Sequence, residues 1–444
     1  DHRDLHSFPT RRSSDLIRMW IFILSIGLII FLSHLFTTLF EKTRIPDVLL
    51  LMLIGIGIGP LAGWISPLHF GTFGNVLTTV ALIVILFEGG TSLRLSEMKK
   101  AALPMSVLTV LTFLLTAGIC FAVAYWLIGM EIIPAMLCGT IMGGTSSAVV
   151  IPMIRSLKVK EPVYSVLMIE SALTDVLCIV CTFVLIDAGT GYESIGTGSV
   201  VWSLTSTLIF AALIGIAGGI GWMLLLKWVR AYPNTMFTTL AFVFILFGLA
   251  EMLGLSGAIT ALTFGITLGN LPEGKKLKSG RELVFNRINE QEKNFFSESV
   301  FLLKTFFFLY LGISIQFESW QLYLMGGLIV LLVFVMRVPI TWLAFSKKRD
   351  RQSVRIASVM VPKGLAAAVL AGMPLTAGVP GSGDIQGLVF AVVLISIIVS
   401  ALLTPFVNSL FPYRQMFASY QKDGEENTMP SQAGQQAAEI REEL

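Results

Sequence analysis

Long runs of apolar residues, separated by short polar or glycine-containing connections, fill most of this sequence. A run of about 20 apolar residues is long enough to cross the hydrocarbon core of a bilayer as a helix. The pattern predicts an all-α, multi-pass membrane protein with about 13 transmembrane helices. The expected spans are residues 18–40, 45–64, 74–93, 103–128, 132–154, 162–187, 199–226, 235–253, 256–270, 295–316, 322–345, 354–377 and 385–411.

The composition agrees with this class. Of 444 residues, 55% are hydrophobic and 13% are charged, whereas soluble domains have about 45–50% and about 25%. The four cysteines all lie in apolar segments, so Cys178 and Cys181 are expected to be packing residues rather than a redox or metal pair.

The basic residues indicate how the chain crosses the membrane. Outside the spans, they fall in alternate connections, such as the one with Lys99 and Lys100, or in the C-terminal tail. By the positive-inside rule, we expect the N-terminus outside the cell membrane and the C-terminus in the cytoplasm. An odd number of spans likewise places the two termini on opposite sides of the membrane.

The two ends of the chain differ from residues 17–411, which form the expected transmembrane domain. Residues 1–16 are polar, lack the apolar core of a signal peptide, and match a common sequencing-library adapter translated in frame. We therefore treat them as a non-native segment. Residues 412–444 are polar and rich in Gln, Ala and Glu, and we expect a mostly disordered cytoplasmic tail.

The fifth and twelfth spans are interrupted by glycine and proline. Residues 143–147 read Gly-Gly-Thr-Ser-Ser, and residues 362–364 read Pro-Lys-Gly. Interrupted segments at matching positions of two halves point to a transporter binding site. If spans 1–6 and 8–13 form two six-helix halves joined by span 7, each broken helix is the fifth of its half. The halves then have opposite orientations and form an inverted repeat.

The sixth span carries four oxygen-bearing side chains, Glu170, Ser171, Thr174 and Asp175. At about 100° per residue, they share an arc of about 140° on one side of the helix. An ionisable group at membrane depth costs about 2.5–3.5 kcal/mol on insertion scales and marks an ion or proton pathway. A polar network that only holds helices together is the alternative.

Four further charges lie within the predicted spans. Arg337 with Glu170 is most simply an ion pair that braces two helices. Lys363 either offsets the carbonyl ends of the broken helices or extends to the cytoplasmic surface. For Lys304 we expect Glu88 as the partner.

Sodium and potassium are hard cations that prefer oxygen ligands, which carboxylates, hydroxyls and unwound backbone carbonyls supply. A proton and a cation that compete for Asp175 would produce exchange. The chain has no Gly-x-x-x-x-Gly-Lys-Ser/Thr loop for ATP and no basic run typical of nucleic-acid binding. We therefore expect secondary transport without a cofactor, a nucleic-acid partner or an enzymatic reaction.

Six motifs follow one another along the chain: residues 86–90, Thr145 with Ser146, residues 170–175, residues 306–312, Arg337 and residues 361–366. This ordered set resembles the monovalent cation:proton antiporter family, in the branch of bacterial and archaeal sodium/proton antiporters and animal sodium/proton exchangers. The resemblance covers nearly all of residues 17–411. It implies a thirteen-helix fold, usually a homodimer, in which a core bundle carries the ion past a dimerisation bundle.

The resemblance also assigns roles to single residues. Asp175 matches the ion- and proton-binding aspartate, and Glu170 and Ser171 match the glutamate and serine one turn earlier. Thr145 matches the helix-5 threonine whose oxygens reach the ion, and Arg337 matches the arginine that pairs with the glutamate. The ligands implied for Na⁺ or K⁺ are thus Asp175, Ser171 and Thr145.

Two residues depart from the family pattern. Thr174 stands where electroneutral exchangers usually have Asn and electrogenic ones Asp, and Ser146 replaces an Asp common in the first group. Exchange of Na⁺, or Li⁺, for H⁺ is the favoured interpretation, with K⁺/H⁺ antiport second and a cation channel or non-transporting sensor third. One titrating carboxylate predicts electroneutral 1:1 exchange; Glu88 would be the second carboxylate if exchange is electrogenic.

Overall fold

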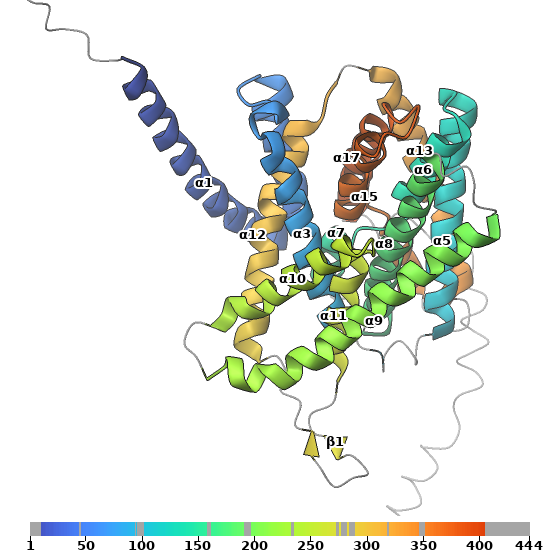
Figure 1. The fold of residues 1–444 in the computed structure, drawn as a ribbon. Helices are drawn as coiled ribbons and strands as arrows, with labels where there is room; N and C mark the ends of the chain where they lie inside the picture. Colours follow the sequence, from blue (N-terminus) through green and yellow to red (C-terminus); the bar gives the residue numbers. More distant parts are fainter. Residues whose placement is uncertain are drawn as a thin grey trace, which may run out of the picture.

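The protein is a bundle of membrane-length helices (Figure 1). The computed structural model describes residues 10–404, except 44–45, 94, 96–101, 158–160, 191–196, 232–234, 272–274, 277–281, 284–288, 318 and 346–350. The expected tail at 412–444 and residues 1–9 of the adapter-like segment lie outside the described residues. Residues 10–16 begin the first helix.

All thirteen expected spans occur as single helices or as two or three consecutive helices, with ends within a few residues of the expected ones apart from the first and last spans. The first six spans are α1 (Thr10–Thr43), α2 (Asp47–Ile56) continued by the π-helical turn η1 (Gly57–Leu61), α3 (Gly71–Ser92), α5 (Ala102–Ala122) continued by η3 (Val123–Ile128), the pair α6 (Ile132–Met142) and α7 (Ser147–Ser156), and α8 (Glu161–Gly189). A short 3-10 turn, η2 (Pro67–His69), precedes α3.

The seventh span and the second half follow in the same way. They are α9 (Thr197–Val229), α10 (Thr238–Met252) after the turn η4 (Thr235–Phe237), α11 (Gly257–Asn270), α12 (Glu290–Ser314), α13 (Trp320–Phe345), the broken helix α14 (Arg351–Val359), α15 (Leu365–Leu370) and α16 (Met373–Thr376), and α17 (Ile385–Leu403). One small departure from an all-helical chain is a pair of two-residue strands, β1 (Lys275–Lys276) and β2 (Glu282–Leu283), at one end of the bundle (Figure 1).

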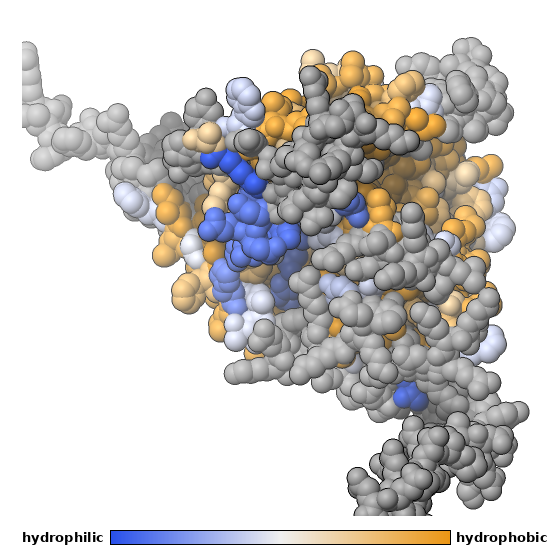
Figure 2. All heavy atoms as spheres, turned by 90° about the horizontal axis from the view of Figure 1, so that it is seen from below, coloured by the Kyte–Doolittle hydropathy of each residue, from blue (hydrophilic) through white to orange (hydrophobic). Residues whose placement is uncertain are grey.

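The surface is that of a multi-pass membrane protein. Among the described residues, seven helices are long and apolar enough to cross a membrane, and five further spans contain shorter apolar helices. Apart from Trp20 within α1, the exposed tryptophans of the described residues lie near helix ends, for example Trp228 at the end of α9, as expected at a membrane interface. Figure 2 shows described hydrophilic residues gathered within one end of the molecule and hydrophobic residues along its rim.

Helix pairing agrees with two structurally related halves, as the expected inverted repeat requires. α2 packs on α12, which joins spans 2 and 10, and α3 packs on α11, which joins spans 3 and 9. Span 9 is the counterpart of span 2 in the second half, and span 10 is the counterpart of span 3. Exchanging the halves therefore converts the pairing of spans 2 and 10 into the pairing of spans 9 and 3. Both pairings depend on glycine, because a Cβ atom on Gly55 or Gly312 would collide with the backbone of the partner helix, and so would one on Gly90 or Gly265.

The helices form two bundles. The core bundle contains α5 to α8, α13 to α15 and α17, and the scaffold bundle contains α1 to α3 and α9 to α12. Contacts between the two bundles include α15 on α3 and α17 on α2. Both broken helices belong to the core bundle, which therefore holds the candidate site.

The division between spans 8 and 9 is a tight turn. Gly254 has a φ of +70°, a conformation that glycine adopts without steric penalty. Glu251 accepts a hydrogen bond from the Gly257 amide at 2.8 Å, and the hydroxyl of Ser256 accepts one from the Ile259 amide at 3.4 Å. These contacts satisfy amides at the start of α11 and separate it from α10.

Candidate cation site

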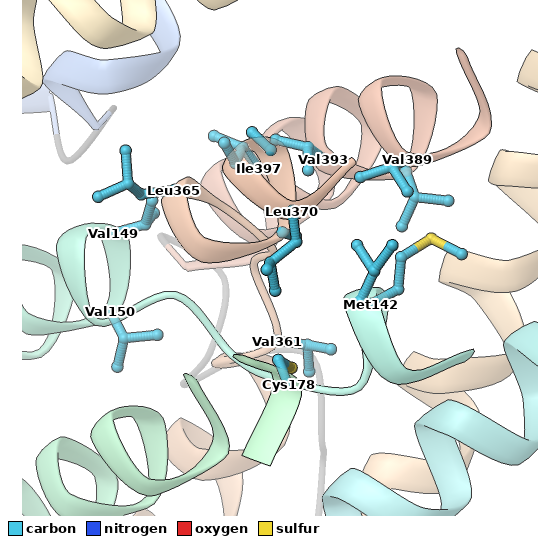
Figure 3. Close-up of a cluster of buried hydrophobic side chains, with 14 of the residues drawn as sticks. Met142, Val149, Val150, Cys178, Val361, Leu365, Leu370, Val389, Val393 and Ile397 are labelled. Atoms are coloured by element: carbon cyan, nitrogen blue, oxygen red, sulfur yellow. The ribbon is translucent and has the colours of Figure 1, made fainter. Parts of the chain in front are cut away.

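The two broken helices cross at their breaks. Residues 143–146 separate α6 from α7, and residues 360–364 separate α14 from α15. The Ser146 amide donates a hydrogen bond to the Pro362 carbonyl oxygen at 2.8 Å. A Cβ atom on Gly364 would collide with the Ser146 side chain, so this crossing requires glycine. Figure 3 shows the apolar side chains around the crossing, including Val361 from the second break.

An equivalent hydrogen bond, from a backbone amide to a hydroxyl, holds each break to the membrane helix that follows it. The Thr145 amide donates to the Thr174 hydroxyl on α8 at 3.1 Å. In the other half, the Lys363 amide donates to the Ser396 hydroxyl on α17 at 2.9 Å. A buried amide that lacks an intrahelical partner requires such an acceptor. The two breaks are therefore held by matching hydrogen bonds in the two halves, although the carboxylates Glu170 and Asp175 both lie on α8.

Asp175 lies beside the first break. Its side chain is 9% exposed, and its Oδ2 accepts a hydrogen bond from the Ser147 hydroxyl at 3.1 Å. Ser147 is the first residue of α7, and the partial positive charge of a helix N-terminus favours a neighbouring carboxylate. Within the described part of the chain, no basic side chain forms an ion pair with Asp175. This carboxylate is therefore available to a proton or a cation.

Glu170, one turn earlier, is already neutralised. Arg337 donates to both of its carboxylate oxygens, at 2.7 and 2.8 Å, and both side chains are 1% exposed. Arg337 also donates to the Thr112 hydroxyl at 2.6 Å and to the Ala357 carbonyl oxygen at 3.0 Å. The expected ion pair is present and connects α13 to α8, α5 and α14.

Lys363 has turned toward the first break rather than toward the membrane surface. Its Nζ donates to the Gly144 carbonyl oxygen at 2.6 Å, and the residue is 2% exposed. Of the two alternatives for Lys363, the structure therefore has the one in which it offsets a carbonyl end, that of α6.

The expected hydroxyl ligands take part in other hydrogen bonds. The Thr145 hydroxyl lies 3.3 Å from that of Thr174 and 3.5 Å from Glu170 Oε1, and the Ser171 hydroxyl donates to the Met168 carbonyl within α8 at 3.0 Å. Among the described hydrogen bonds, none joins Asp175 to Ser171 or Thr145.

Ser146 is buried at the crossing, where its side chain lies next to Gly364. Sequence reasoning gave no role to Ser147, although its position directly after the break is a usable signal.

The expected pairing of Lys304 with Glu88 is wrong. Lys304 Nζ lies 2.8 Å from Asp47 Oδ2, and both side chains are largely buried. Asp47 begins α2, and the close packing of α2 on α12 brings it to Lys304. Glu88 instead accepts a hydrogen bond from the Ser92 hydroxyl on the same helix at 3.4 Å. Apolar patterning does not identify neighbouring helices, and so it could not select between two acids.

The comparisons with known proteins agree with the fold. Residues 27–409 match the family described as sodium/hydrogen exchanger, transmembrane. A K⁺/H⁺ antiporter of Shewanella oneidensis is 25% identical over 386 residues, which are 83% of this chain and 63% of the relative. A Na⁺/H⁺ antiporter of Bacillus atrophaeus is 25% identical over 397 residues, which are 82% of this chain and 70% of the relative.

A solved structure shares the architecture. The sodium proton antiporter of Methanocaldococcus jannaschii superposes with a TM-score of 0.66 at 21% identity, covering 88% of this chain and 98% of that one. At this identity, the likeness shows the fold alone. The chain spans about 63% of the length of the Shewanella oneidensis relative.

Crossed broken helices within an inverted repeat define a multi-pass ion-transporter fold. The chain belongs to the transmembrane sodium/hydrogen exchanger family, which confirms the expected monovalent cation:proton antiporter family.

Proposed function

We propose that this protein is a secondary antiporter that exchanges a monovalent cation for H⁺ by alternating access at Asp175. The observation that carries the proposal is the contrast between its two central carboxylates. Glu170 is fully paired with Arg337, whereas the described hydrogen bonds of Asp175 all come from Ser147 and none comes from a charged group. Of these two carboxylates, Asp175 alone is left to change its partner during a transport cycle.

A bound cation would take oxygen ligands from both sides of the first break. Asp175 supplies the charge, and Ser147 supplies a hydroxyl already directed at it. Ser171 and Thr145, the ligands implied by the resemblance, lie on α8 and at the break and complete the proposed set. A proton and a cation that compete for one carboxylate, each released on the opposite side of the membrane, are exchanged.

Na⁺ is the first candidate for the cation, with Li⁺ as an analogue, and K⁺ is the second. The matched relatives are named both as Na⁺/H⁺ and as K⁺/H⁺ antiporters. Thr174 and Ser146 add oxygen atoms without charge to the site, so they do not separate the two ions.

The proposal also includes the location of the protein, its orientation in the membrane and its partners. We place the protein in the cell membrane with its N-terminus outside and residues 412–444 in the cytoplasm, because the basic connections alternate along the sequence. Residues 17–411 form the transporting domain, and residues 1–16 are not native. The lipid bilayer and a second copy, in a homodimer, are the proposed partners.

The test is proton movement in proteoliposomes, followed with a pH-sensitive dye after addition of Na⁺, K⁺ or Li⁺ separately. Antiport predicts proton flux only with a transported cation, and none with Asp175→Asn, because Asn keeps the shape but neither titrates nor carries charge. Proton flux without added cation would favour a channel. Flux near the wild-type level in Asp175→Asn would reject Asp175 as the exchange site.

A further inference from the structure

The first break carries one charge at each of its two helix ends. The ammonium of Lys363 lies on the Gly144 carbonyl, two residues past the C-terminal end of α6, and the carboxylate of Asp175 lies at the amide end of α7. A helix C-terminus carries a partial negative charge and an N-terminus a partial positive one, so each group faces the sign that stabilises it.

The position of the Lys363 ammonium is one that suits a metal cation. Unwound carbonyls and the C-terminal ends of half-helices coordinate transported cations in broken-helix transporters. A Cβ atom on Gly144 would lie 3.2 Å from the Thr174 carbonyl oxygen, so the end of α6 packs directly on α8 one residue before Asp175. Without the ammonium, this end would present unpaired carbonyl oxygen beside the candidate site.

Lys363 is held in this position from both ends. The Ser396 hydroxyl fixes its backbone amide, and the Gly144 carbonyl oxygen fixes its Nζ. Among the described residues, it forms no ion pair with a carboxylate. In the described structure, the ammonium is therefore held by the Gly144 carbonyl oxygen and not by a carboxylate.

We propose that Lys363 is a tethered cation, which fills a second cation position at the Gly144 carbonyl after α6 and limits the carrier to one mobile cation per cycle. This inference rests on the proposed antiport at Asp175. The mobile cation is repelled from the Gly144 side by the ammonium and binds on the side of Asp175 and Ser147. Removing the ammonium creates a second cation site that does not depend on Asp175.

The test measures the melting temperature of the purified full-length chain in detergent against NaCl or KCl, with choline chloride as the ionic-strength control. The wild type is expected to be stabilised by the cation, and Asp175→Asn alone is expected to lose this stabilisation. Lys363→Met/Asp175→Asn is expected to regain it, by about 2–3 °C at a salt concentration 100 times the dissociation constant. Lys363→Arg/Asp175→Asn, which keeps the charge, is the matched control and is expected to show no gain.

The inference is overturned if NaCl and KCl stabilise the Met double variant no more than the Arg double variant. If the wild type itself shows no stabilisation that depends on Asp175, the proposed function fails instead. If the Met variants do not fold, the inference is tested instead by measuring the rate of wild-type exchange as a function of cation concentration. A Hill coefficient of about 1 supports a single mobile cation, and a value of about 2 overturns the inference.

Discussion

Removal of the Glu170 carboxylate would leave a buried guanidinium without its charge partner. Arg337 is 1% exposed, so the group cannot reach water, and its two remaining partners, Thr112 and the Ala357 carbonyl, carry no charge. Breaking a buried pair by removing one member destabilises a protein by about 3–5 kcal/mol. We expect a loss of this size for Glu170→Ala.

The expected change in melting temperature follows from the size of the chain. An unfolding entropy of about 2.1 cal/mol/K per residue, applied to 444 residues, gives about 1 °C for each kcal/mol. Glu170→Ala should therefore melt about 3–5 °C below the wild type when the purified protein is followed by tryptophan fluorescence. Glu170→Ala/Arg337→Met, which removes both charges, should recover most of that loss.

The exposed pair Lys293–Glu290 supplies a matched control. Its atoms lie 2.7 Å apart, but both side chains are more than half exposed. Glu290→Ala should change the free energy of unfolding by less than about 1 kcal/mol. If the double variant at Glu170 and Arg337 is as unstable as the sum of the two single variants, the two residues do not act as a pair and the reasoning is wrong.

Three other predictions concern transport and the scaffold. Ser147→Ala should raise the half-saturating cation concentration about tenfold while Ser147→Thr should not, and equal effects of the two would exclude a ligand role for the hydroxyl. Exchange at Asp175 alone should reach the same end-point pH gradient at 0 and −100 mV; a shift worth about 2.3 kcal/mol would indicate a second titrating carboxylate. Asp47→Asn should lower the melting temperature and Asp47→Asn/Lys304→Met restore it, whereas the same rescue of Glu88→Gln by Lys304→Met would contradict the observed pair.

The sequence alone determined the class, the spans and the breaks. Water is absent from the hydrocarbon core, so an apolar run of membrane length must satisfy its backbone groups as a helix. For this reason, the thirteen spans and the division at Gly254 could be predicted. The glycines and prolines at 143–147 and 362–364 marked the broken helices, and the polar arc on α8 marked Glu170 and Asp175.

The tertiary structure decided which other side chains meet, beyond the Glu170–Arg337 pair that was already expected from the sequence. The glycines that let α2 approach α12 placed Asp47, rather than Glu88, beside Lys304. The crossing of the two breaks turned Lys363 onto the end of α6 and Ser147 toward Asp175. Periodicity gives the face of a helix on which a residue lies but not the helix that covers that face, because the neighbour depends on close backbone approaches between distant segments.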